Sequence, residues 1–335
     1  MTNRLSCAGT PEARRQIFTG PAGLGLLAGA ALIVVTTTPA HAIILLSTGD
    51  ITANTTAPGG LLAGSGWQYE GTWGGVLGTA IAPNYFVTAT HVGGSVGGTF
   101  NYNGNNYTTT AKFSSPSSDL TIWQVSGTFT SYAPLYTGTD EVGHDLVDIG
   151  RGTRRGADVT IASGPDAGLK GWQWGTAAGV QRWGQYTVSG IANGGGSLGQ
   201  LLVADFNSLA SGGLTYEATL SSGDSGGGLF IQSGGVWKLA GINYAVDNPF
   251  RTSAGGTDFN AAIFDARGLY FNSGSGFQQV GHPVPDGEVS ASFYATRISS
   301  NLGWIESVTA VPEPQMCATG AGLALLAFAV ARRRC

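Results

Sequence analysis

Short apolar runs separated by turn residues make up most of the chain. Between residues 75 and 89, apolar pairs lie on both sides of a Pro83-Asn84 turn, which is the pattern of a β-hairpin. Residues 100–111 alternate aromatic and polar side chains around Asn103-Gly104. Further strands are predicted at 120–125, 146–149, 201–206, 228–231 and 237–242. Because turn residues recur between them at short intervals, the pattern predicts an all-β barrel or sandwich.

Towards the end of this region the apolar period changes to that of a helix. In 297–308, Ile298, Leu302 and Ile305 recur at helical spacing, so one helix is expected there. Residues 247–288, ahead of that helix, are rich in Gly, Asn and Asp and show no metal-ligand spacing. We therefore expect 247–288 to be an insertion of solvated loop, and we expect no bound metal.

The first 42 residues have the pattern of an export leader. Arg14-Arg15 precede an apolar stretch over 21–35, and Ala40-His41-Ala42 places small residues where a signal peptidase reads them. The sequence predicts a signal peptide over 1–42. The arginine pair fits both an ordinary secretory leader and a twin-arginine signal, so the export route stays open.

Residues 309–335 form a second terminal segment. Pro312-Glu313-Pro314 breaks the chain, 318–331 is apolar, and Arg332 to Arg334 follow. This order resembles the PEP-CTERM sorting signal of Gram-negative bacteria. The resemblance implies recognition by an exosortase, transient anchoring by a transmembrane helix, and delivery to the cell surface, outer membrane or extracellular matrix. The alternative is a simple membrane anchor, although the apolar stretch is short of the about 20 residues that a span needs.

Composition narrows the class of protein further. Hydrophobic residues make up 42% of the 335 positions, which excludes an intrinsically disordered chain. A net charge of -4 gives no electrostatic footprint for nucleic acid, so none is expected as a partner. Cys7, Cys317 and Cys335 all lie in the two terminal segments. The body between them therefore has neither a disulfide nor a thiolate metal site.

Three segments of the body carry candidate chemistry. Glycines surround one serine in the run from Ser222 to Gly228, where the backbone can turn sharply and successive amides can point at one spot. His91 follows a predicted strand, and Asp119 precedes another. Taken singly, each has an ordinary structural interpretation: a glycine-rich turn, a surface histidine and a turn-initiating aspartate.

In the order His, Asp, Ser, these segments resemble the trypsin-like (chymotrypsin-fold) serine proteases. The matching stretches are 78–81 with 88–91, 119–122, 223–227, 239–242 and the closing 294–305. The resemblance implies two six-stranded antiparallel β-barrels of the chymotrypsin type with a C-terminal helix, over a protease domain at 43–308. Val92 and Ser221 stand where that family usually has disulfide cysteines. That departure makes the loops around the specificity pocket harder to predict.

The resemblance also implies the roles of single residues. Ser225 would attack the scissile bond of a polypeptide substrate, His91 would act as general base, and Asp119 would orient the imidazole. Backbone amides of Gly223 and Ser225 would form the oxyanion hole. The function expected is that of a serine endopeptidase working through an acyl-enzyme, without a cofactor.

Specificity and activation are also expectations from the resemblance. Thr219 would form the base of the pocket for the side chain before the cleaved bond, with Tyr244 and Val246 along its wall. This neutral set favours small or medium apolar side chains over Arg or Lys. Signal-peptide cleavage after Ala42 would expose Ile43, whose new ammonium would pair with the structural residue Asp224. Alternatively, an internal side chain or turn holds Asp224.

Two other functions fit the same sequence. One is a catalytically idle surface or matrix-binding protein on the same fold, although no member of the triad is missing. The other is a matrix protein that binds polysaccharide, with some of the eight tryptophans as sugar platforms.

Overall fold

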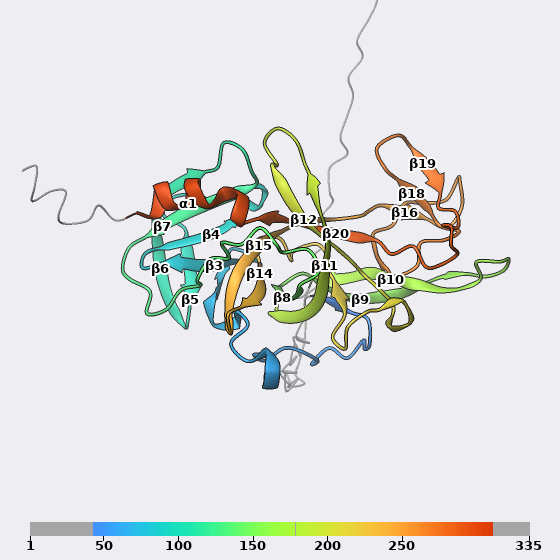
Figure 1. Cartoon of the computed structure of the whole chain (residues 1–335), viewed down its shortest axis with the longest axis horizontal. Helices are drawn as coiled ribbons and strands as arrows, with labels where there is room; N and C mark the ends of the chain where they lie inside the picture. Colours follow the sequence, from blue (N-terminus) through green and yellow to red (C-terminus); the bar gives the residue numbers. More distant parts are fainter. Residues whose placement is uncertain (1–42, 178, 311–335) are drawn as a thin grey trace, which may run out of the picture. The chain divides into compact units, whose positions relative to one another are not determined.

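The structure is a computed structural model, and it describes residues 43–177 and 179–310. Almost all of its regular structure is β-strand (Figure 1). The predicted leader, 1–42, lies outside the described residues, and so does the predicted sorting segment from residue 311 onward. In the described ranges, every helix is too short or too polar to cross a membrane.

Six strands close into a first antiparallel barrel. They are β2 (Glu70–Trp73), β3 (Val76–Ala82), β4 (Tyr85–Ala89), β5 (Thr99–Tyr102), β6 (Asn105–Ser114) and β7 (Leu120–Val125), joined in the order β2-β3-β4-β7-β6-β5. Aromatic rings fill the interior, where Phe86 stacks on Phe100 with ring centroids 3.9 Å apart. The predicted hairpin around Pro83-Asn84 becomes β3 and β4, and the predicted 120–125 strand becomes β7.

A second antiparallel barrel follows along the chain. Its strands are β8 (Asp145–Gly150), β11 (Arg182–Asn193), β12 (Gln200–Asp205), β14 (Gly228–Ser233), β15 (Val236–Val246) and β20 (Ser292–Arg297), closed in the order β11-β12-β20-β15-β14-β8. Leu146, Tyr186, Leu202, Leu229 and Phe293 belong to its core. The predicted all-β fold with two six-stranded antiparallel barrels is thereby confirmed.

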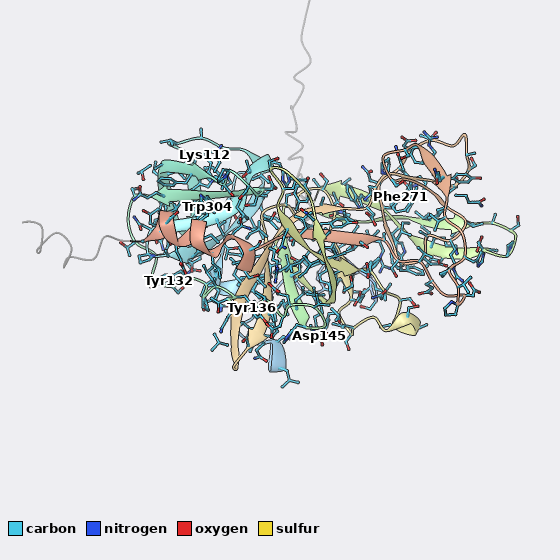
Figure 2. All side chains as sticks on the ribbon, turned by 45° about the horizontal axis from the view of Figure 1, so that its top comes forward. Lys112, Tyr132, Tyr136, Asp145, Phe271 and Trp304 are labelled. Atoms are coloured by element: carbon cyan, nitrogen blue, oxygen red, sulfur yellow. The ribbon has the colours of Figure 1, made fainter. Side chains whose placement is uncertain are left out.

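One apolar cluster joins the two barrels and carries the C-terminal helix. Leu77 and Val87 of the first barrel and Val147 and Leu239 of the second belong to it, as does Ile305 of α1 (Leu302–Thr309). Trp304, labelled in Figure 2, packs partly buried against the same cluster. The helix therefore covers the apolar joint between the barrels.

The predicted helix over 297–308 begins too early. Arg297 is the last residue of β20 and pairs with Gly241 of β15, and its Nε donates to Glu141 at 2.9 Å. A single 3₁₀ turn, η5 (Ser299–Asn301), precedes α1. Ile298 fits the helical spacing of the apolar residues that follow it. However, Arg297 is held in β20 by its pairing with Gly241 and by its buried ion pair with Glu141, so the helix cannot begin at residue 297.

The expectation of a solvated loop over 247–288 is wrong. This insertion contains β16 (Phe250–Arg251), β17 (Ala261–Ile263), β18 (Tyr270–Asn272) and β19 (Phe277–Gln279). Phe250, Ile263 and Leu269 are buried in a cluster of their own, and Phe271, labelled in Figure 2, packs on Phe250. Strands of two or three residues are too short to show alternation, which is why the sequence pattern missed them.

The insertion is attached to a long hairpin. β17 pairs with β10 (Gly168–Ala177), which pairs with β9 (Thr153–Ile161). Lys170 and Asp265 form a buried ion pair at 2.7 Å between them. The remaining elements are β1 (Ile44–Leu45), paired with β13 (Ala218–Thr219), and the 3₁₀ turns η1 (Gly60–Leu62), η2 (Trp67–Tyr69), η3 (Thr90–Val92) and η4 (Leu209–Ser211).

Candidate active site

Strand pairing places His91 beside Asp119. His91 lies in η3, directly after β4, and Asp119 directly precedes β7. In the antiparallel register, Ala89 lies opposite Leu120, so the two chain ends meet at the same rim of the first barrel. The Thr90 amide donates to the Asp119 carbonyl at 3.0 Å, which extends the pairing one step beyond the strands.

The Asp119 carboxylate holds the His91 ring and its backbone together. Oδ2 lies 2.6 Å from His91 Nδ1, and Oδ1 accepts from the His91 amide at 3.1 Å. The side chain of Asp119 is 8% exposed and that of His91 is 40% exposed. A buried carboxylate accepts only, so Nδ1 is the donor and the exposed Nε2 has a free lone pair as a base.

Ser225 brings the second barrel to the same place. Its Oγ lies 2.8 Å from His91 Nε2. The serine occupies the loop between β13 and β14, and the next amide, of Gly226, donates to the Asn243 carbonyl of β15 at 3.0 Å. The structure thus brings together all three predicted catalytic side chains, in one line from carboxylate to imidazole to hydroxyl.

Close packing of the serine loop explains two of its glycines. A methyl group at Gly226 would lie 2.3 Å from the Thr88 hydroxyl oxygen and 2.6 Å from the Leu77 carbonyl oxygen. One at Gly227 would lie 1.9 Å from the Ile149 carbonyl oxygen. All three distances are far inside van der Waals contact, so only glycine lets this loop lie directly against β3, β4 and β8.

The two amides next to Asp224 in the chain form no internal hydrogen bond among the described residues. Neighbouring amides form hydrogen bonds within the loop: the Asp224 N–H donates to the Ser221 carbonyl, and the Gly227 N–H donates to the Asp224 carbonyl. Within 43–177 and 179–310, the Gly223 and Ser225 amides donate to no acceptor. Gly223 has φ 96°, a left-handed conformation that favours glycine. These are the two amides expected to stabilise a developing oxyanion.

Asp224 lies behind the serine, in a buried site with several donors. Its carboxylate accepts from the Gly152 amide at 2.6 Å, the Ser221 amide at 2.7 Å and the Ser221 hydroxyl at 2.9 Å. The Ile43 backbone nitrogen lies 3.4 Å from Oδ1. Desolvation outweighs these donors and raises the pKa of Asp224 to about 6. Internal groups and the Ile43 peptide amide therefore share this carboxylate, and its pairing with a free Ile43 ammonium stays a prediction.

A pocket of about 260 Å³ opens beside Ser225. Its lining consists of Trp174, Leu220, Ser221, Ser222, Ser225, Tyr244, Ala245 and Val246. The structure thus places the predicted residues Tyr244 and Val246 at the pocket. Thr219 does not line it: this residue is buried in β13, opposite Ile44 of β1.

Sequence reasoning missed two residues of the pocket wall. Leu220 follows β13, and Trp174 comes from β10, a strand that the sequence analysis did not predict. The alternation Trp172-Gln173-Trp174 is typical of a strand and could have indicated β10. Nothing in that pattern indicates which pocket the strand borders.

Tyr244 also contacts His91. The rings of Tyr244 and His91 meet edge to face, with centroids 5.6 Å apart and planes at 81°. Burial raises the pKa of the Tyr244 phenol, and the nearby charge of Asp119 adds to this effect. The phenol therefore stays neutral and supports the imidazole by packing. Within the part of the chain that the structure describes, no group of three or more His, Cys, Asp or Glu side chains is placed to hold a metal ion.

Comparisons with known proteins concern the fold. No protein-family model and no curated protein matches the chain. Neuropsin, a serine protease expressed in the limbic system of mouse brain, matches with a TM-score of 0.45 and 12% identity, over 74% of this chain and 96% of that one. Rv3671c from M. tuberculosis H37Rv, an inactive mutant form, matches with a TM-score of 0.39 and 13% identity, over 75% and 92%.

A third solved structure is the passenger domain of plasmid encoded toxin, an autotransporter enterotoxin from enteroaggregative Escherichia coli. It matches with a TM-score of 0.38 and 14% identity, over 68% of this chain and 21% of that one. At such identities a likeness concerns the fold alone, and these TM-scores lie below 0.5. The argument for function therefore rests on the residues of the site.

Proposed function

We propose that this protein is a serine endopeptidase. The observation that supports it is the unbroken contact from Asp119 through His91 to Ser225, with steps of 2.6 and 2.8 Å. Two unused amides flank Asp224 on the same loop. A nucleophile, a base, an orienting carboxylate and oxyanion donors are the parts that acyl transfer needs, and here they meet within one site.

The geometry supports a two-step reaction. Ser225 Oγ attacks the carbonyl carbon while His91 Nε2 takes its proton, and the negative charge forms on the carbonyl oxygen beside the Gly223 and Ser225 amides. The imidazolium then returns the proton to the leaving amine as the C–N bond breaks, which leaves an acyl-enzyme. Water attacks this ester by the same proton path and frees Ser225. Asp119 stabilises the imidazolium in both steps.

We propose a preference for small or medium apolar side chains before the cleaved bond. Leu220, Val246 and Trp174 give the pocket apolar walls, and no acidic side chain is among its lining residues. An arginine or lysine would have no ionic partner there, and burying its charge would be costly. A peptide library with strong preference for Arg or Lys at this position would contradict the assignment.

The site of action belongs to the proposal as well. The leader pattern over 1–42 and the Pro312-Glu313-Pro314 motif with its arginine cluster support export and exosortase-dependent sorting to the cell surface or matrix of a Gram-negative bacterium. Expression with and without residues 312–335, followed by protease accessibility on intact cells, tests this. Surface delivery that does not depend on 312–335 contradicts the sorting role.

An active-site label tests the proposed chemistry directly. A fluorophosphonate probe should label the wild-type protein and the Ser307→Ala variant, which removes an exposed hydroxyl on α1, and it should fail to label Ser225→Ala. The endopeptidase assignment also requires cleavage of an internally quenched peptide with both ends blocked. Wild-type protein that is folded but unlabelled would favour the catalytically idle surface protein instead.

A further inference from the structure

A partly buried guanidinium without an anionic partner belongs to Arg151, whose backbone packs against the proposed oxyanion loop. Arg151 directly follows β8, and desolvation lowers its pKa. Its Nη1 donates to the Gly75 carbonyl at 3.3 Å. None of the carboxylates in the described ranges forms an ion pair with it. A guanidinium has five N–H donors, so most of its capacity for an anion is unused.

The surrounding contacts place Arg151 at the site. The next residue, Gly152, donates its amide to Asp224 at 2.6 Å, and a methyl group at Gly223 would lie 3.1 Å from the Gly152 Cα. Gly223 carries one of the two unused amides. Gly75, which accepts from the guanidinium, lies in the turn between β2 and β3. Arg151 therefore bridges the oxyanion loop and the rim of the first barrel.

A second pocket, of about 280 Å³, borders the same turn. Gly75 and Val76 line one part of it, and Val92, Gly94 and Ser95 line another. The latter three follow His91, the residue that must return a proton to the leaving amine. The pocket beside Ser225 and Tyr244 takes the acyl side, so the leaving segment passes His91 towards this second pocket and towards Arg151.

We propose that Arg151 selects polypeptides that carry a carboxylate within the first two residues after the cleaved bond, with an adjacent side chain held between Val76 and Val92. The inference rests on the proposed function and names the substrate class of that site. A carboxylate matches the fork of N–H donors and completes the pairing of a charge that is already partly desolvated. An Asp or Glu side chain and the free C-terminus of a leaving fragment offer the same chemistry.

Matched peptides test the selection. The first set of peptides has amidated C-termini and carries Glu or Gln at the first or second position after the cleaved bond. A further peptide ends at the second of these positions with a free C-terminal carboxylate. We expect kcat/KM to be about tenfold higher with the carboxylate, as for one charge-assisted contact. Arg151→Gln should bring this ratio close to one, and Arg151→Lys should keep part of it.

Arg251→Gln is the matched control, because it removes the same charge from an ion pair with Asp258 in the insertion. It should keep the wild-type ratio. An advantage confined to the Glu peptides assigns a side-chain carboxylate, and one confined to the free terminus assigns the end of a fragment; each supports the proposal. Equal rates for charged and neutral peptides in the wild type, or an unchanged ratio in Arg151→Gln, overturns it.

Binding to the Ser225→Ala variant, followed by fluorescence anisotropy, separates this inference from the proposed function. A binding preference for carboxylate peptides that disappears with Arg151→Gln supports the role of Arg151, even if the wild-type protein hydrolyses none of them. Absence of hydrolysis would then refute only the proposed peptidase function. Hydrolysis without any preference in either assay refutes the role of Arg151 alone.

Discussion

At the scale of single residues, the proposed reaction depends on the Ser225 hydroxyl and the His91 Nε2 atom, which lie 2.8 Å apart. Ser225→Ala removes the nucleophile and should lower kcat by roughly 10⁴-fold or more, and His91→Ala should cost nearly as much, because the three side chains act as a unit. The measurement is kcat on a saturating peptide, with thermal unfolding to show that the fold is unchanged. Turnover of a tenth of the wild-type value in Ser225→Ala would refute the assignment.

Gly226 tests how closely the serine loop must approach the first barrel. Gly226→Ala should abolish activity and destabilise the fold by roughly 1–3 kcal/mol, because the new methyl group meets Thr88 and the Leu77 carbonyl. Gly212→Ala is the matched control: its φ of 92° is close to the 85° of Gly226, but a methyl group there meets nothing within 4 Å. Both variants are compared by urea unfolding and peptide turnover. Equal effects would show that the conformation of the glycine, and not the close approach, determines the loss.

At the scale of elements, the segment from Ile43 to Asp50 is bound along its length to residues of β9, β11 and β13. Arg182 donates to the Ile43 carbonyl at 3.1 Å, Arg155 donates to those of Leu45 and Leu46, and β1 pairs with β13. The Ile43 nitrogen ends this segment 3.4 Å from Asp224, two residues from the Gly226 turn. Ile43 itself therefore lies close to the serine loop.

We predict that the active exported form begins at Ile43. An ammonium there would pair with the buried Asp224 carboxylate, which desolvation disfavours as an anion. N-terminal sequencing of the active form checks this, together with turnover of a variant that keeps Gly-Ser ahead of Ile43. A start well downstream of Ile43, or full activity with the additional residues, favours the alternative in which the internal donors from Gly152 and Ser221 hold Asp224 alone.

At the scale of the whole molecule, buried carboxyl groups lie in both barrels. Glu70 of β2 accepts from the Thr79 hydroxyl at 2.7 Å, and Asp148 of β8 accepts from the Asn243 amide at 2.8 Å. Burial raises the pKa of each to about 8, and the charge of Asp148 adds to the effect on Glu70. Both carboxyl groups are therefore mostly protonated in the folded protein at neutral pH.

From the raised pKa values of Glu70 and Asp148, we predict that the free energy of unfolding decreases as the pH rises from about 4 to about 8. In this interval the folded state holds protons that the unfolded chain has released, so the free energy of unfolding decreases by about 1.4 kcal/mol per pH unit for each proton retained. Urea unfolding at pH 5, 6, 7 and 8 measures the slope. Glu70→Gln keeps a neutral acceptor for Thr79 and should flatten it. A slope that is unchanged in this variant, or stability that rises over the interval, contradicts the prediction.

The strands next to His91 and Asp119 could be predicted from local patterns, whereas the pairing of β4 with β7 joins residues far apart in the chain. The apolar pairs around Pro83-Asn84 and the run from Leu120 to Val125 predict β3, β4 and β7, and this hairpin with its neighbouring strand places His91 beside Asp119. Alternation reports which face of its own strand a side chain occupies, and together with the apolar runs it indicated strands such as β4, β7, β14 and β15, whereas the longer strands β9, β10 and β11 were missed. The short strands of the insertion carry too few residues to alternate, and only their joint packing around Phe250 and Leu269 buries them.

The sequence by itself indicated an all-β chain and the strands next to the site, because periodicity and turn chemistry act within a few residues. The two-barrel architecture and the three candidate side chains came from the resemblance to trypsin-like serine proteases. Tertiary structure alone decided which residues surround those side chains. It pairs Thr219 with Ile44 and keeps it out of the pocket lining, brings Trp174 of β10 to the pocket, and sets Arg151 against Gly75 of the other barrel. These contacts join residues far apart in the chain, and no local pattern of the sequence encodes such contacts.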